Sequence, residues 1–94
     1  MQIVDPEIVV IFGRKHADAK DALDAWRDHV GLTIWRTPSD LKAEYPDASI
    51  LSGNRVIFDI KGRKYRLQVT VYYRRQVVEV EWIGTHAEYN RKRF

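Results

Sequence analysis

The sequence predicts an α+β protein in which N-terminal helices pack on a small antiparallel β-sheet. Apolar residues repeat at helical spacing in the first half of the chain and alternate with polar residues in the second half. The two patterns do not interleave, which is typical of α+β folds rather than of parallel α/β folds. At 94 residues without repeats or linkers, we expect one domain, residues 1–94.

The first residues predict a short strand followed by a helix. Residues 2–4 are the strand candidate. The apolar run 8–11 favours a strand by propensity, yet Asp5 suits a helix N-cap and Pro6 the first helical position. We therefore expect a helix over residues 6–15.

Two further helices follow. One apolar helical face is formed by Ala19, Ala22, Leu23, Trp26 and Val30. Gly31 predicts the end of this helix. Thr37 before Pro38 begins a short third helix, which Pro46 ends.

From Ala48 onward the apolar period is two. We expect three antiparallel strands, at residues 55–60, 64–73 and 77–83, with a hairpin turn at Gly62. The predicted core face comprises Val56, Phe58, Ile60, Tyr65, Leu67, Val69, Val71, Val78, Val80 and Trp82. The opposite face carries Arg55, Ile57, Asp59, Lys64, Arg66, Gln68, Thr70, Glu79 and Glu81.

Positive charge is concentrated in the predicted sheet. Residues 1–54 carry six Lys/Arg and nine Asp/Glu, whereas residues 55–94 carry ten and four. A one-sided basic surface is expected of a protein that binds a phosphate backbone. Ordinary solubilising charge explains the same asymmetry equally well.

We expect the cationic strand face to lie next to His86 and Tyr89 in the fold, and together these groups suit RNA cleavage without a metal. Attack of a 2′-hydroxyl on its own phosphate needs a base, stabilisation of the phosphorane charge and an acid for the leaving oxygen. Arginine grips phosphate oxygens through two parallel donors, and histidine exchanges protons near pH 7.

Structural roles compete with these chemical ones. Arg66 suits a cross-strand ion pair with Glu79 or Glu81 as well as a phosphate contact. Lys61 and Arg63 suit a solvated hairpin, and the Tyr89 ring suits packing against the sheet. His16 and His29 lie in or beside helices, and we expect both to be structural.

Several classes of protein are excluded or disfavoured. The chain has no cysteine, which rules out disulfides and thiolate zinc sites. Asp59 and Lys61 imitate the carboxylate-plus-lysine pattern of metal-dependent nucleases, but the predicted order of elements supplies no clustered partners, so we expect no metal and no cofactor. No apolar run reaches about 18 residues, so we expect a cytoplasmic protein without a membrane partner.

Four stretches resemble, in order, the HigB family of bacterial toxins, within the RelE-like superfamily: KHADAKDALDAW, TPSDLKAEYPDASIL, NRVIFDIKGRKYRLQV and IGTHAEYN. The resemblance runs from about His16 to Asn90. It implies a RelE-like fold and an mRNA interferase, an endoribonuclease that cuts messenger RNA on the translating ribosome. Asp59 stands where the family pattern leads us to expect asparagine, and Ala17 where proline is more usual.

The resemblance also implies roles for individual residues. Lys64 and Arg66 match the segment assigned to phosphate binding and transition-state stabilisation. His86 matches a general acid or base, and Tyr89 a substrate-orienting group or proton donor. Further RNA contacts are expected at Arg55, Lys61, Arg63, Arg74, Arg91 and Lys92, with Arg93 adding non-specific attraction that weakens with salt.

The implied partners are a HigA-like helix-turn-helix antitoxin, the ribosome with its mRNA, and operator DNA only through the antitoxin. Two alternatives stay open. One is a non-catalytic RNA- or ribosome-binding inhibitor of translation. The other is a degenerate toxin that only binds its antitoxin in operon repression, to which the unexpected Asp59 lends support.

Overall fold

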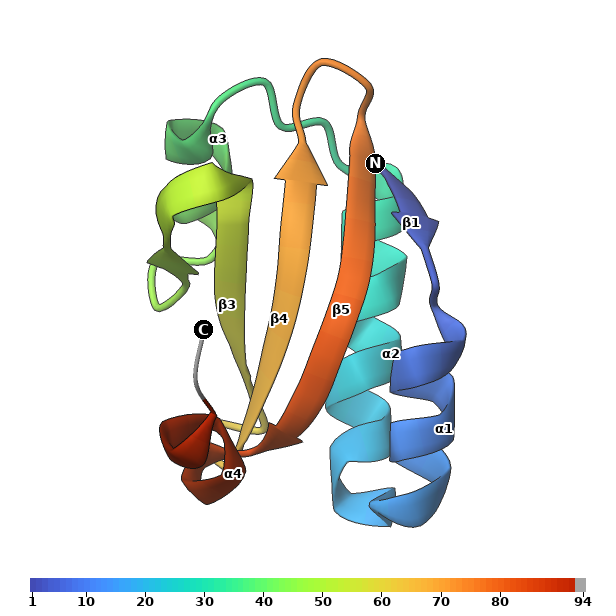
Figure 1. The fold of residues 1–94 in the computed structure, drawn as a ribbon. Coiled ribbons are helices and arrows are strands. Elements are labelled where there is room, and N and C mark those ends of the chain that lie inside the picture. The colour runs from blue at the N-terminus through green and yellow to red at the C-terminus, as the bar shows by residue number, and fades with distance from the viewer. Residues whose placement is uncertain (93–94) are drawn as a thin grey trace.

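The computed structural model describes residues 1–92, which form three N-terminal helices, a β-sheet and a short final helix (Figure 1). The elements are β1 (Gln2–Val4), α1 (Glu7–Lys15), α2 (Ala17–Leu32), α3 (Pro38–Glu44), β2 (Ser49–Ile50), a 3₁₀ turn (Ser52–Asn54), β3 (Arg55–Ile60), β4 (Tyr65–Tyr72), β5 (Val77–Thr85) and α4 (His86–Arg91). The predicted α+β class is confirmed.

The sheet has the strand order β1-β5-β4-β3-β2. Strands β3, β4 and β5 form the predicted antiparallel meander. The predicted strand at residues 2–4 is present as β1 and pairs in parallel with β5, while the unpredicted β2 pairs with β3. Helices α1 and α2 cover one face, and α4 lies against the lower end of the other, open face (Figure 1).

The core lies between the sheet and the helices. The predicted face of α2 supplies Leu23, Trp26 and Val30, which are at most 3% exposed. Phe58 of β3 is 1% exposed, and its ring centroid lies 5.5 Å from that of Trp26. Burying each such side chain stabilises the fold by about 1.5–3 kcal/mol, so alternation in the strands and helical spacing in α2 fix how the layers pack.

Two predicted helix boundaries are wrong. Helix α1 has Pro6, not Asp5, as its N-cap. Asp5 has a φ of 58°, outside the extended conformation that a capping side chain needs. Helix α2 continues through Gly31 to Leu32, and Thr33 is its C-cap. The predicted start of the third helix at Thr37 is confirmed, and Thr37 also forms a capping box with Asp40 that was not predicted.

Strand β5 contains a β-bulge that changes the face of the residues after it. Val80 pairs with Val69 but Trp82 pairs with Gln68, so Glu81 is the extra residue. Beyond the bulge Ile83, at 9% exposed, takes the core position opposite Leu67. The prediction that Trp82 continues the core face is wrong, because strict alternation fails at the bulge.

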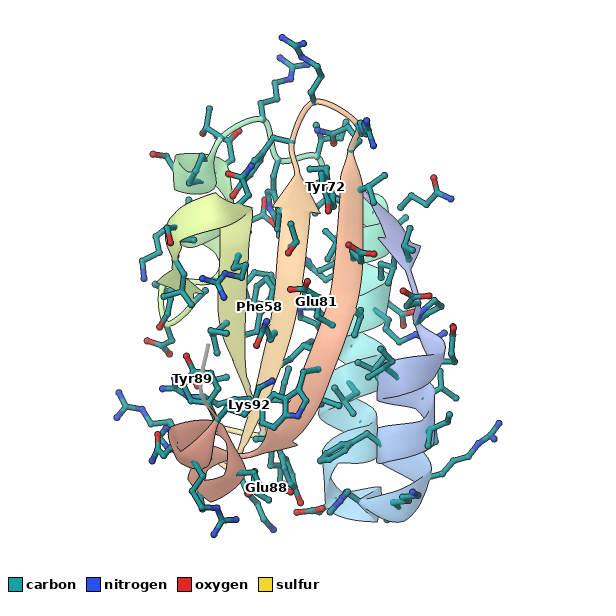
Figure 2. All side chains as sticks on the ribbon, viewed as in Figure 1. Phe58, Tyr72, Glu81, Glu88, Tyr89 and Lys92 are labelled. Atoms are coloured by element: carbon teal, nitrogen blue, oxygen red, sulfur yellow. The ribbon has the colours of Figure 1, made fainter. Side chains whose placement is uncertain are left out.

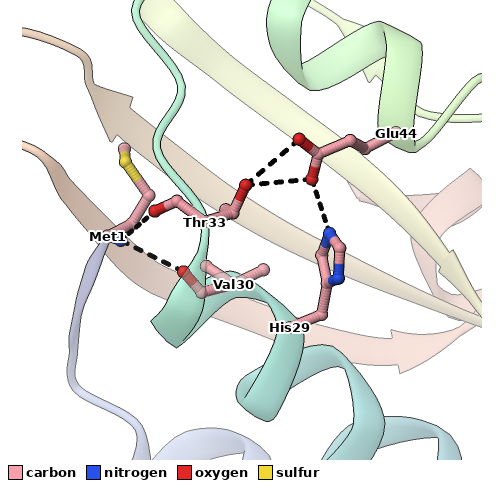
Figure 3. Close-up of polar contacts among 5 residues, drawn as sticks. All are labelled: Met1, His29, Val30, Thr33 and Glu44. Atoms are coloured by element: carbon pink, nitrogen blue, oxygen red, sulfur yellow. Dashed lines mark hydrogen bonds and ion pairs between the residues drawn. The ribbon is translucent and has the colours of Figure 1, made fainter.

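The segment after α2 is tied to the N-terminus and to α3 (Figure 3). The Met1 ammonium group donates hydrogen bonds to the carbonyl oxygens of Val30 and Thr33. The Thr33 hydroxyl donates to the Glu44 carboxylate, which also lies 2.5 Å from His29 Nε2. Partial desolvation raises the pKa of Glu44, but the bonds from His29 and Thr33 outweigh it, so the net pKa lies below its ordinary value.

Candidate nucleic-acid interface

Helix α4 turns the end of β5 back over the open face of the sheet. Its N-cap Thr85 accepts a hydrogen bond from the Glu88 backbone, and the Glu88 side chain accepts one from the Thr85 backbone. This capping box is visible in the sequence as Thr85-His-Ala-Glu88, yet we expected only a strand end here. Because residues three apart are neighbours on a helix, α4 explains the spacing of His86 and Tyr89.

Arg66 of β4 lies on the open face and is largely enclosed. Its cross-strand partners are Asp59 and Gly84. Arg66 Nε lies 3.4 Å from Asp59 Oδ1, and the side chain is 20% exposed. The ion pair is therefore with Asp59, and the expected pairing with Glu79 or Glu81 is wrong, because register places Asp59 directly opposite Arg66.

Tyr89 of α4 covers the Arg66 guanidinium group. The guanidinium carbon lies 4.7 Å from the centroid of the Tyr89 ring, a cation–π contact. Such a contact at a partly desolvated site contributes about 0.5–2 kcal/mol. The structure thus brings together two of the four predicted catalytic residues.

Trp82 belongs to the same cluster, although the sequence pattern assigned it to the core. Its ring centroid lies 6.2 Å from that of Tyr89, and Lys92 Nζ lies 4.7 Å above it. Gly84 makes room for this ring, since a Cβ at Gly84 would lie 2.5 Å from Trp82 Cζ2. Tyr89 and Lys92 lie over the lower end of the sheet, beside α4 (Figure 2).

His86 is the first residue of α4 and is partly buried. Its backbone N–H donates to the Lys64 carbonyl oxygen, and its Nδ1 lies 3.4 Å from Asn90 Nδ2. These contacts hold the start of α4 against the turn before β4. His86 therefore lies one helical turn before Tyr89, with its ring next to Asn90.

Lys64 faces away from this cluster. It lies in the turn before β4, and its ammonium group forms an ion pair of 2.5 Å with Asp18, at the start of α2. The hydrogen bond from Lys64, followed by one from Tyr65, lowers the pKa of Asp18, and Asp18 in turn raises the pKa of Lys64. The prediction that Lys64 shares the exposed face with Arg66 is wrong, because the helix layer supplies a carboxylate.

The other predicted RNA contacts divide between the two ends of the sheet. Lys61, Arg63 and Arg91 are exposed and lie near α4, at what we call the α4 end. Arg55 begins β3, and its Nε donates to the Ser52 carbonyl oxygen. Arg74 lies in the β4–β5 turn at the opposite, β4–β5 end of the sheet (Figure 1), and Arg93 lies outside the described residues.

The middle of the open face is acidic. The bulge residue Glu81 accepts hydrogen bonds from the Gln68 amide and the Thr70 hydroxyl, at 3.3 and 2.9 Å. Glu79 accepts one from the Tyr72 hydroxyl and thereby raises the Tyr72 pKa. Glu81 lies near the middle of the sheet and Tyr72 towards the β4–β5 end (Figure 2). On this face Glu79 and Glu81 therefore lie farther along β5 from α4 than Gly84, the residue opposite Arg66.

Residues 1–92 contain no group of three or more His, Asp or Glu side chains arranged to hold a metal ion. Within the same residues, no helix is long and apolar enough to cross a membrane.

Comparison with known families gives one match. A family model described as HigB_toxin, the RelE-like toxic component of a toxin-antitoxin system, matches residues 19–92. No curated protein matches the chain. The matched residues include most of α2 together with α3, the β3–β5 meander and α4, and so contain the Arg66–Tyr89 cluster.

Proposed function

The chain belongs to the HigB family of RelE-like toxins, and from this premise we propose that it is an endoribonuclease that cleaves messenger RNA on the translating ribosome. As the toxic component of a toxin–antitoxin system, it has an antitoxin partner. The observation that carries the proposal is the stacking of Arg66 on Tyr89, beside His86, on the cationic end of an open sheet face.

In the proposed reaction a 2′-oxygen bonds to the adjacent phosphorus while the bond to the 5′-oxygen breaks. Arg66 stabilises the charge that develops on the phosphorane oxygens, because a guanidinium group stays charged and donates two parallel hydrogen bonds. His86 exchanges a proton with either the attacking or the leaving oxygen. Tyr89 holds Arg66 in place and orients the substrate or donates a proton.

The remaining cations act in RNA binding. Lys61, Arg63, Arg91 and Lys92 supply non-specific attraction to RNA at the α4 end, which weakens as salt increases. Lys64 contributes to catalysis only after its ammonium group leaves Asp18. Arg55 is a peripheral contact. Arg74 lies beyond the far end of β4, eight residues from Arg66, and at about 3.3 Å per residue this is too far for both to contact one phosphate.

One observation favours a second candidate. The Asp59 carboxylate already neutralises Arg66, as it would in a degenerate toxin that only binds its antitoxin. Under the leading proposal an RNA phosphate displaces Asp59 from Arg66. Breaking that ion pair opposes phosphate binding, so cleavage is slower than it would be without Asp59.

The test is inducible expression in a bacterial host with transcriptome-wide mapping of new RNA 5′ ends. Wild type, Arg66→Ala, His86→Ala and Tyr89→Phe are compared with Arg14→Ala, a control that removes an exposed cation from α1. The proposal expects growth arrest with new ends that Arg66→Ala and His86→Ala suppress and the control does not. Growth arrest without new RNA ends would show a non-catalytic inhibitor. If the protein is folded and causes neither arrest nor new ends, it is a degenerate toxin.

A further inference from the structure

We propose that the antitoxin docks through an acidic and apolar segment at the β4–β5 end of the sheet, in an open depression of about 770 Å³ around Ile34. This Ile34 depression is lined by Met1, Gln2, Ile34, Arg36, Tyr73, Arg74 and Gln76. The inference rests on family membership, which gives the chain an antitoxin partner, and is independent of RNA cleavage.

The first support is exposed aliphatic surface. Leu32 is 89% exposed and Ile34 is 65% exposed, more than any other large apolar side chain of residues 1–92. They lie on either side of Thr33 at the end of α2; Ile34 lines the depression, and Leu32 lies outside its lining. Clustered exposed aliphatic groups beside a concavity mark a protein-interaction site.

The second support is that hydrogen bonds and burial hold the backbone around Leu32 and Ile34 in one conformation. Thr33, between the two aliphatic residues, is held through its hydroxyl by Glu44 and through its carbonyl oxygen by the Met1 ammonium group (Figure 3). The next residue, Trp35, is fully buried, and its carbonyl oxygen accepts a hydrogen bond from the Gln76 side chain. With Thr33 and Trp35 fixed, Leu32 and Ile34 are held towards solvent, ready for a partner.

The third support is charge. Arg36 and Arg74 line the depression and are exposed, and neither forms an ion pair with another described residue. None of the described lining residues is acidic. A segment that places carboxylates beside the arginines and an apolar side chain over Ile34 is complementary to this surface.

The same features argue against RNA as the occupant. Proteins bind single-stranded RNA by stacking bases on exposed aromatic rings, whereas the most exposed large apolar side chains here are the aliphatic ones of Leu32 and Ile34. Exposed leucine and isoleucine gain little from a phosphate backbone but much from burial against a protein.

The position of the depression has a consequence for neutralisation. It lies at the opposite end of the sheet from α4, so the docked segment leaves the Arg66–Tyr89 cluster uncovered (Figure 1). Inhibition then requires the rest of the antitoxin. Either a second segment reaches α4, or the bound antitoxin sterically prevents the toxin from reaching the ribosome.

The experiment uses the product of the helix-turn-helix reading frame beside the toxin gene, identified by co-purification with the wild-type chain. Its affinity is measured by calorimetry for wild type, Leu32→Asp, Ile34→Asp and Arg36→Glu with Arg74→Glu. Ile11→Asp and Arg14→Glu are matched controls, because they change a 48% exposed isoleucine and an exposed arginine on α1. Circular dichroism and thermal melting check that each variant folds.

We expect each aspartate variant to weaken binding by about 100-fold or more, as replacement of a central contact does, and the arginine pair to do so most at low salt. The controls stay within about twofold of wild type. Unchanged affinity in the folded aspartate and glutamate variants would overturn the proposal. It would also be overturned if the arginine pair lost binding to ribosomes while the antitoxin bound normally.

The outcome is separable from that of the proposed function. Leu32→Asp keeps any cleavage that wild type has but escapes neutralisation, so its growth arrest persists when the antitoxin is co-expressed. Absence of cleavage in wild type would refute the ribonuclease proposal and leave the binding measurements interpretable.

Discussion

Both ends of the β-sheet carry cations on exposed surface, but the neighbours of those cations differ. At the α4 end, Arg66 and Lys92 stack on the rings of Tyr89 and Trp82. At the β4–β5 end, Arg36 and Arg74 flank the exposed Ile34. Glu79 and Glu81 lie on the face between them.

The difference teaches that charge alone does not assign a binding partner. The sequence placed Arg66 and Arg74 in one basic surface, since both fall in the cationic second half of the chain. Their surroundings separate them, because aromatic rings and a polar face suit RNA whereas aliphatic side chains suit protein. Variants that act on one end and spare the other test this division.

The largest expected effect is on cleavage. Arg66→Ala removes the group proposed to stabilise the phosphorane, and we expect the rate to fall by about 10²–10³-fold, as for loss of one transition-state donor. Arg74→Ala at the other end leaves the rate within about twofold. Single-turnover cleavage of a ribosome-bound mRNA measures both, and equal losses in the two variants would remove the distinction between the ends.

Gly84→Ala is expected to disturb the packing of the Trp82 ring at the α4 end. Its Cβ would lie 2.5 Å from Trp82 Cζ2, so the indole must move from its place near Tyr89. We expect a destabilisation of about 1–3 kcal/mol, the usual cost of overpacking, with a change in tryptophan fluorescence. Antitoxin affinity, a property of the other end, stays unchanged.

Gly31→Ala is the control for that substitution. Gly31 lies within α2, and nothing lies within 4 Å of where its Cβ would be. Alanine there stabilises the protein by about 0.5–1 kcal/mol, the difference between glycine and alanine in a helix. Urea unfolding measures both variants, and a Gly84→Ala protein as stable as Gly31→Ala would show that the Trp82 ring is not held as described.

A smaller effect, in the opposite direction, is expected at Asp59. Asp59→Asn removes the carboxylate 3.4 Å from Arg66 Nε and leaves the guanidinium group for phosphate. We expect RNA cleavage to rise about three- to tenfold, which corresponds to roughly 1 kcal/mol. Asp47→Asn, in the exposed loop after α3, controls for the added positive charge. A fall in cleavage would mean that Asp59 positions Arg66 rather than competing for it.

The smallest expected effect concerns pH. Lys64 and Tyr65 lower the pKa of Asp18 below its ordinary value of 3.8, so the unfolded chain binds this proton more readily than the folded one. The resulting stability is present above about pH 4 and is lost as the pH falls through the lowered pKa. Thermal melting therefore shows Asp18→Asn less stable than wild type at pH 7, with the gap closing in acid. A constant gap would contradict the linkage.

The sequence predicted the fold better than the site because the two depend on different information. The α2 face, the meander and the helix start at Thr37 follow from local spacing, and all are present. The Asp59–Arg66 ion pair depends on strand register, and the Lys64–Asp18 pair joins residues 46 positions apart. No periodic pattern contains either contact.

Two missed features differ in whether the sequence carried a signal. Thr85 and Glu88 indicate the start of helix α4, because their spacing is that of a capping box. The bulge at Glu81 had no comparable mark, because Val-Glu-Val-Glu-Trp-Ile continues an apparently regular alternation. Only the pairing of β5 with β4 shows where the strand register shifts by one residue.

That bulge gives β5 two independent phases. Up to Val80 the even-numbered residues face the core, whereas beyond the bulge the odd-numbered Ile83 does, so that Trp82 faces the surface under α4. Substitution in the first part is therefore limited by packing in the core, and substitution of Trp82 by its contact with the Tyr89 ring. A single added residue lets one strand serve the core and this surface cluster without either setting the phase of the other.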